Sequence, residues 1–166
     1  MNIRALLISA ILFPCITPPL AIAADTESPQ QVMTTGLNHI GLTVKNLSAS
    51  SDFFIHTLGW KQAGGYPDYP SIFVTDGKIF VTLWQTKNPE HAIEFDRKNN
   101  IGLHHLALTV NSEETLEVLH QRFKLMPSVV IEFAPELNGK GPTKHMIIRE
   151  PSGNRIEFAY TPSRNK

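Results

Sequence analysis

The segment Leu103-His104-His105-Leu106-Ala107-Leu108-Thr109-Val110 repeats an earlier one, Leu37-Asn38-His39-Ile40-Gly41-Leu42-Thr43-Val44. Five of the eight positions are identical, and His39 and His105 occupy the same place in each copy, at an offset of 105 − 39 = 66 residues. A repeat of this length is too long for a solenoid unit and suits a small duplicated βα module. Side chains in a strand alternate between two faces. We therefore expect one apolar face in each copy, suited to helix packing, and an opposite face that carries the histidine among small neighbours.

The composition is that of an ordinary globular chain. Its 166 residues suit one domain, or two small modules that share a core. The formal charge of zero and the pI near 7.1 give no electrostatic argument for binding nucleic acid or an anionic membrane. We therefore expect neither nucleic acid nor a membrane as a partner of the mature chain.

The N-terminus has the pattern of a secretory signal peptide. Arg4 precedes an apolar run over residues 5–16, and Ala21-Ile22-Ala23 is an A-x-A cleavage site. The uninterrupted apolar run is too short to cross a hydrocarbon core of about 30 Å. We expect residues 1–23 to be removed, residues 24–34 to form a polar leader, and the protein to be periplasmic or secreted. A retained membrane anchor is the alternative.

The rest of the chain, residues 35–162, is predicted to form a single α+β domain of two βαβββ modules. The modules cover residues 35–84 and 101–161, and residues 85–100 form a polar linker. Period-two alternation indicates the strands, and apolar residues three and four apart after a serine cap indicate one helix in each module. The predicted strands are residues 37–44, 60–63, 71–75, 79–84, 103–110, 129–134, 144–150 and 155–160. The predicted helix caps are Ser48 and Ser112, and residues 136–143 are predicted to be a mobile loop.

Cys15 is the single cysteine and lies within the predicted signal peptide. The mature chain therefore has neither a disulfide nor a thiolate metal ligand, and its apolar core has to hold the fold.

Two histidines on matching strands and one carboxylate on another strand form the chemically most informative set. His39 and His105 are the histidines, and Glu157 is a charged side chain in an otherwise apolar strand. Imidazole and carboxylate groups suit Fe, Mn, Zn, Ni or Co as divalent ions, and three protein ligands leave positions open for water or substrate. The alternative is a buried histidine bonded to a backbone carbonyl, with Glu157 paired to Arg149 or Arg155. Recurrence of the histidine in both copies favours the metal hypothesis.

The motifs around these residues resemble the vicinal-oxygen-chelate (VOC) superfamily, which includes glyoxalases, bleomycin-resistance proteins and extradiol dioxygenases. The resemblance covers about residues 37–161. The matching segments are His39-Ile-Gly-Leu-Thr-Val, Ser51-Asp-Phe-Phe, Leu58-Gly-Trp, His105-Leu-Ala-Leu-Thr-Val and, most specifically, Pro151-Ser-Gly-Asn-Arg-Ile-Glu157-Phe. The resemblance implies that the modules form a curved mixed sheet around a metal cup, with helices on the outer face. It also implies that His39, His105 and Glu157 bind one divalent metal ion.

The fourth ligand position of the superfamily falls in the strand predicted at residues 79–84. It is Thr82 or Phe80, depending on how the Asp76-Gly77 turn is aligned, and neither residue is a carboxylate or a histidine. Glyoxalase I enzymes use a glutamate there as ligand and proton-transfer base. The three-ligand pattern therefore resembles extradiol dioxygenases and fosfomycin-modifying enzymes instead.

The resemblance supports hypotheses from different classes. The first is an exported, divalent-metal-dependent, glyoxalase-like lyase or isomerase that chelates two adjacent substrate oxygens, with a ring-cleaving dioxygenase as its alternative. The second is a non-catalytic small-molecule binder of the bleomycin-resistance type, and the third is a family member with a structural role. A monomer and a homodimer are both compatible with the sequence. The catalytic candidates are Glu157 and His145, and the substrate-pocket candidates are Thr82, Trp84, Phe80, Arg149 and Tyr66, with Arg97 as a contact for a substrate carboxylate.

Overall fold

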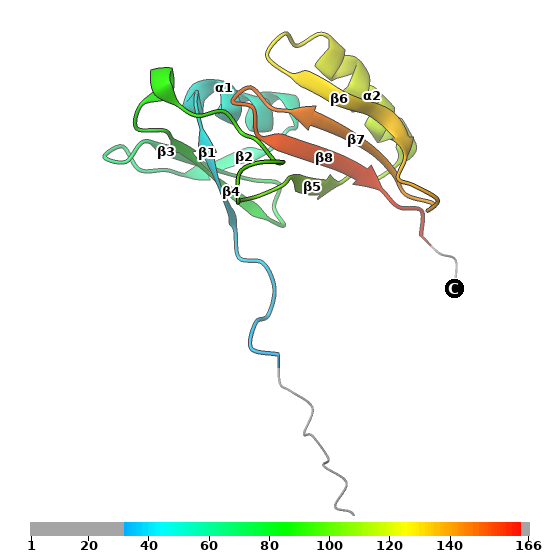
Figure 1. The fold of residues 1–166 in the computed structure, drawn as a ribbon. Helices are drawn as coiled ribbons and strands as arrows, with labels where there is room; N and C mark the ends of the chain where they lie inside the picture. Colours follow the sequence, from blue (N-terminus) through cyan, green and yellow to red (C-terminus); the bar gives the residue numbers. More distant parts are fainter. Residues whose placement is uncertain (1–31, 164–166) are drawn as a thin grey trace, which may run out of the picture. The chain divides into compact units, whose positions relative to one another are not determined.

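The computed structural model describes residues 32–163, which form two four-stranded mixed sheets (Figure 1). The chain divides between Thr35 and Gly36, and both sheets belong to the unit that begins at Gly36. The predicted signal peptide and its cleavage site lie outside the described residues, as does most of the predicted polar leader.

Each half of this unit builds one sheet with the same topology. The strand order is β1-β4-β3-β2 in the first sheet and β5-β8-β7-β6 in the second. The β1–β4 and β5–β8 pairs are parallel, and the other neighbours are antiparallel. This arrangement confirms the predicted α+β fold of two βαβββ modules, although the strands form two open sheets and not one continuous sheet. The strands are β1 (Ile40–Val44), β2 (Lys61–Gly64), β3 (Ser71–Thr75), β4 (Phe80–Gln85), β5 (Leu106–Thr109), β6 (Val130–Leu137), β7 (Lys144–Arg149) and β8 (Arg155–Tyr160).

The first helix begins earlier than predicted and changes type. Asn46 is the N-cap of α1 (Leu47–Asp52), because its side-chain oxygen accepts a hydrogen bond of 3.0 Å from the backbone N–H of Ala49. The predicted cap, Ser48, therefore lies inside the first turn. The helix continues as the π-helical turn η1 (Phe53–Thr57), which brings both Phe53 and Phe54 into the core.

The second helix matches its prediction. Ser112 caps α2 (Glu113–Lys124) by accepting a hydrogen bond from the backbone N–H of Thr115 at 3.2 Å. Leu116, Leu119 and Phe123 form its buried face. The linker contains one 3₁₀ turn, η2 (Pro89–His91). No helix within residues 32–163 is long and apolar enough to cross a membrane.

The predicted mobile loop at residues 136–143 is partly wrong. β6 continues to Leu137, which pairs with Lys144 of β7, and the backbone N–H of Asn138 donates to the carbonyl of Thr143 at 2.8 Å. The register of the β6–β7 pair is irregular at two points, as at a β-bulge. β6 extends beyond the apolar residues from which this strand was predicted.

One apolar core joins the two modules. The ring of Phe53 stacks on that of Phe123 with centroids 5.7 Å apart, and Phe123 in turn contacts Phe158 of β8 at 5.4 Å. Leu42 of β1 and Leu108 of β5 belong to the same core cluster. The opposite face of β1 and β5 is exposed, at Gly41, Thr43, Ala107 and Thr109. The apolar and polar faces predicted from the repeat are thus present in both modules.

The turn between β7 and β8 joins the modules through polar contacts. Glu150 is fully buried and accepts a hydrogen bond of 2.6 Å from the hydroxyl of Ser50 in α1. The side-chain amide of Asn154 donates to the carbonyl of Thr43, at the end of β1, at 3.0 Å. These contacts hold the end of β1 beside the start of β8, next to the candidate site.

Candidate functional site

The strand register shows which residue of the first module corresponds to Glu157. Glu157 lies opposite Ala107 in the β5–β8 pair. Subtracting the repeat offset from Ala107 gives 107 − 66 = 41, and Gly41 lies opposite Thr82 in the β1–β4 pair. Thr82 is therefore the counterpart of Glu157, and Phe80 is not, because it precedes the residues of β4 that pair with β1. At this position the first module has a hydroxyl where the second has a carboxylate.

Two imidazoles contact the carboxylate of Glu157 on the polar face of the second sheet. His105 Nε2 lies 3.0 Å from Glu157 Oε2, and His145 Nδ1 lies 2.6 Å from Glu157 Oε1. The side chains of Glu157 and His145 are 11% and 13% exposed, so both are largely shielded from water. His145 lies on β7 opposite Ala159. Ala159 is the residue that follows Glu157 on the same face of β8, so the His145 side chain is adjacent to that of Glu157. These three residues form the His–Glu–His cluster.

His39 is not part of this cluster. It lies just before β1, is exposed, and its Nδ1 is 2.7 Å from the side-chain oxygen of Asn38. Within the described part of the chain, no group of three or more His, Cys, Asp or Glu side chains is placed to hold a metal ion. The structure thus brings His105 and Glu157 together and adds His145, while ligation by His39 stays a prediction.

The donor chemistry of the cluster nevertheless suits a divalent metal. Neutral imidazole nitrogens and carboxylate oxygens are the ligands that Mn, Fe, Co, Ni and Zn ions use in proteins. Glu157 directs each oxygen at a different imidazole, so these two contacts fix the orientation of the carboxylate. His145 is thereby placed to orient this carboxylate, as partners of metal ligands commonly do.

An aromatic cluster covers the corresponding face of the first sheet. The ring of Trp84 lies 5.0 Å from Tyr69, 5.5 Å from Phe73 and 6.2 Å from Tyr66, centroid to centroid. Its indole N–H donates to the hydroxyl of Thr82 at 2.9 Å. Three predicted pocket residues, Thr82, Trp84 and Tyr66, therefore lie together. Phe73 was not predicted as a pocket residue, although it lies opposite Thr82 and alternates with the core residue Val74.

Beside the His–Glu–His cluster, Glu132, which was not predicted, pairs with the predicted substrate contacts Arg149 and Arg97. Arg149 Nε donates to Glu132 Oε1 at 2.7 Å, and Arg155 Nε donates to Glu132 Oε2 at 2.6 Å. Arg97 Nη1 lies 3.8 Å from the same Oε2. Burial favours a raised pKa for Glu132, but the hydrogen bonds and charges of Arg155 and Arg149 outweigh it, so the pKa lies below its ordinary value of 4.5. The available sequence signal was a charged residue within the apolar segment at residues 129–134.

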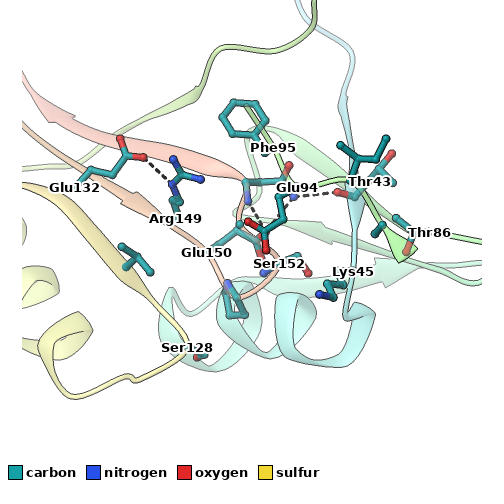
Figure 2. Close-up of a pocket in the computed structure, with 16 residues that line it drawn as sticks. Thr43, Lys45, Thr86, Glu94, Phe95, Ser128, Glu132, Arg149, Glu150 and Ser152 are labelled. Carbon is teal, nitrogen blue, oxygen red and sulfur yellow. Dashed lines mark hydrogen bonds and ion pairs between the residues drawn. The ribbon is translucent and has the colours of Figure 1, made fainter. Parts of the chain in front are cut away.

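Arg149 and Glu132 lie in the wall of a cavity of about 780 Å³ (Figure 2). Thr43 of β1 and Phe95 of the linker also line it, so both modules contribute to this cavity. Arg149 is the one predicted pocket residue in its wall, since Thr82, Trp84 and Tyr66 belong to the aromatic cluster and Phe80 is 45% exposed.

Comparison with known proteins now identifies the family. Residues 36–158 match the Glyoxalase/Bleomycin resistance protein/Dioxygenase superfamily, and the chain belongs to this superfamily. Metapyrocatechase of Geobacillus stearothermophilus is 30% identical over 132 residues, which are 78% of this chain and 38% of that protein. The chain thus spans little more than a third of the length of this relative.

Solved structures share the fold at lower identity. A glyoxylase/bleomycin resistance protein/dioxygenase domain from Frankia sp. is 22% identical with a TM-score of 0.65, over 78% of this chain and 99% of that one. The fosfomycin resistance protein FosX from Listeria monocytogenes is 19% identical with a TM-score of 0.60, over 78% and 96%. Lactoylglutathione lyase from Agrobacterium tumefaciens is 15% identical with a TM-score of 0.59, over 78% and 96%. These likenesses confirm the VOC fold.

Proposed function

We propose that this protein is a divalent-metal-dependent enzyme of the VOC type that acts on a small molecule with two adjacent oxygen atoms. The observation that carries the proposal is the contact of Glu157 with both His105 and His145 on the polar face of the second sheet. When bound, a divalent ion supplies Lewis-acid polarisation of the substrate oxygens. His105 and Glu157 would hold it, and His145 would orient the carboxylate.

We further propose that His39 completes the ligand set from a second copy of the chain. In this chain His39 is exposed and hydrogen-bonded to Asn38, away from the cluster that Glu157 forms. The polar faces of β1 and β5 are also exposed and free to meet those of another copy. The homodimer is therefore the assembly that can provide two histidines and one carboxylate to a single ion.

The proposed site favours a reaction that does not require a carboxylate as the fourth ligand. Thr82 occupies the position equivalent to Glu157, and its hydroxyl accepts from Trp84. A hydroxyl is far too weak a base at neutral pH to replace the glutamate that serves as ligand and base in glyoxalase I. We therefore propose a lyase or isomerase reaction other than the isomerisation of a hemithioacetal.

A ring-cleaving dioxygenase is the second candidate, because the match to metapyrocatechase covers 78% of the chain at 30% identity. The identity of the metal ion that supports turnover distinguishes a dioxygenase from a Lewis-acid enzyme. A dioxygenase requires Fe(II) or another redox-active ion and consumes O₂ with a catechol. A Lewis-acid enzyme retains activity with redox-inert Zn(II).

The first experiment is elemental analysis of the protein purified without chelator, together with His105→Ala. We expect about one divalent ion per chain in the wild type and its loss in the variant. His56→Ala is the matched control, because His56 is exposed on η1 beside Asp52, with which it makes a 3.6 Å contact. Absence of metal after anaerobic reconstitution, with ligand binding retained, would instead establish a metal-free binder of the bleomycin-resistance type.

The contribution of a second copy has its own test. His39→Ala and Glu157→Gln homodimers should each lack metal, whereas a mixture of the two chains should recover one intact site per heterodimer. Recovery of no metal in the mixed dimer would contradict the shared site. We also propose that the protein is exported after cleavage following Ala23, which N-terminal sequencing of the extracytoplasmic protein tests.

A further inference from the structure

The polar face of the second sheet carries an excess of positive charge beside the His–Glu–His cluster. Arg149 and Arg155 lie directly opposite each other in the β7–β8 register, and Arg97 approaches from the linker. All three guanidinium groups converge on the carboxylate of Glu132. The group therefore has a formal charge of 3 − 1 = +2. We refer to these four residues as the arginine cluster.

The three arginines differ in their freedom to bind a ligand. The side chain of Arg155 is 4% exposed, donates to Glu132 and lies over the ring of Phe133 at 5.9 Å, so its role is structural. Arg149 is 32% exposed and uses Nε for Glu132. Arg97 is 22% exposed, and its Nη1 is 3.8 Å from Glu132, which is longer than a hydrogen bond. Because each guanidinium has five N–H donors, Arg97 and Arg149 retain donors for a second anion.

Neighbouring charges reduce this excess but do not cancel it. Glu150 and Asp96 accept hydrogen bonds from neutral groups and keep their negative charges, whereas Lys98 adds a positive one, so the formal charge becomes 2 − 2 + 1 = +1. Glu94 and Lys45 both line the adjoining cavity, and their charges offset each other.

The arginine cluster opens onto a space of the right size for an organic molecule. Arg149 lines both the cavity of about 780 Å³ and a smaller hollow that Arg97 also lines. Figure 2 shows the Arg149–Glu132 ion pair with the ring of Phe95 nearby in the wall. Ile93 lines both spaces as well, so apolar surface flanks the cationic groups.

The cluster is also close to the proposed metal ligands. Arg155 and Glu157 are two residues apart on the same face of β8. Two residues of a strand span roughly 7 Å, which is within the length of a small organic molecule.

We propose that Arg97 and Arg149 bind a carboxylate of the substrate, so that the protein acts on an organic acid whose other end reaches the His–Glu–His cluster. The placement of the other end of the substrate at the His–Glu–His cluster rests on the function proposed above. The anion site itself does not. Two guanidinium groups match the planar, bidentate geometry of a carboxylate. The flanking Phe95 and Ile93 favour an organic anion over inorganic phosphate.

The test uses the full chain stripped of metal with a chelator, so that anion binding is measured without the metal site. Benzoate is titrated into the wild type, Arg97→Gln and Arg149→Gln by calorimetry, with inorganic phosphate as a parallel probe. Each variant should weaken benzoate binding by roughly 10-fold or more, because each removes a charge-assisted contact. Lys61→Gln is the matched control, since it removes one positive charge from the exposed strand β2 and should leave binding unchanged.

Two further variants protect the test from a folding defect. Arg149→Lys keeps the charge but loses the planar fork, so it should bind benzoate more weakly than the wild type while still folding. Glu132→Gln removes the internal competitor, so added benzoate should raise its melting temperature more than that of the wild type. Benzoate binding that is equal in the wild type, Arg97→Gln and Arg149→Gln would overturn the proposal. Tighter binding of phosphate than of benzoate would overturn the assignment to an organic acid.

The two proposals fail in different ways. Loss of metal binding with retained benzoate binding would leave the anion site in place and remove the metal-dependent reaction. Normal metal content with no effect of Arg97→Gln or Arg149→Gln would remove the anion site alone.

Discussion

The hydroxyl of Ser50 in α1 donates a hydrogen bond of 2.6 Å to Oε2 of Glu150, which joins the two modules through a fully buried carboxylate. The same carboxylate accepts hydrogen bonds from the backbone N–H groups of Ser152 and Asn154 at 3.0 and 3.1 Å. Glu150 therefore shapes the turn that precedes β8 and, through it, the position of Glu157 two residues inside that strand.

Glu150→Ala should lower the free energy of unfolding by roughly 3 kcal/mol, because it leaves several buried donors without an acceptor. Urea denaturation monitored by circular dichroism measures this change. Ser50→Ala removes the hydrogen bond to the carboxylate and a second one of 2.7 Å with the hydroxyl of Ser152, and should cost about 1.5 to 3 kcal/mol. A loss below about 0.5 kcal/mol for Glu150→Ala, the range of ordinary surface substitutions, would contradict the role of this junction.

Phe53→Ala should destabilise the protein by about 3 to 5 kcal/mol, since it opens a cavity in the core that both modules share. The ring is 1% exposed and stacks on Phe123. Thermal or urea unfolding measures the loss. Val118→Ala on α2 is the control, because Val118 is 56% exposed and its truncation should change stability by less than about 0.5 kcal/mol. Separate unfolding transitions for the two modules in the wild type would contradict a single shared core.

The stabilising contribution of Glu132 should depend on pH. Its pKa is lowered in the folded state, so its contribution is fully present above the unfolded-state pKa, near 4.5, and is lost as the pH falls through the lower folded-state value. The stability difference between the wild type and Glu132→Gln should therefore be constant near neutral pH and shrink in acid. Urea midpoints measured across this range provide the test. A difference that grows as the pH falls below 4.5 would contradict the assignment.

His145→Gln should weaken metal binding by roughly 10-fold without changing its stoichiometry. Substitutions of residues that hydrogen-bond to a metal ligand commonly have this effect. His145 Nδ1 contacts Glu157 Oε1 at 2.6 Å and so orients the carboxylate. Competition with a chromophoric chelator measures the affinity. His105→Ala, in contrast, should abolish binding. Complete loss of metal in His145→Gln would show that His145 is itself a ligand, and unchanged affinity would show that it has no positioning role.

The local pattern of the chain was sufficient to predict the fold. The repeat around His39 and His105, with its period-two alternation, indicated two equivalent strands with one apolar and one polar face, and the structure has both. Ser112 predicted the start of α2 because a cap acts on neighbouring backbone N–H groups. The start of α1 was wrong by two residues, since Asn46 and Ser48 can both act as caps and the sequence alone did not discriminate between them.

The sequence by itself determined the two βαβββ modules, their shared core and the identity of Glu157 as an unusual charge in a buried strand, because these depend on the order and spacing of side chains along each strand or helix. Only the tertiary structure decided how strands far apart in the chain align. The strand register shows that Thr82, and not Phe80, is the counterpart of Glu157. It also places His145 next to the carboxylate of Glu157. The packing of the modules and the path of the linker placed His39 outside the cluster and Arg97 beside Glu132. These distances depend on how whole strands, helices and loops pack against one another. The spacing of residues along the sequence does not determine that packing.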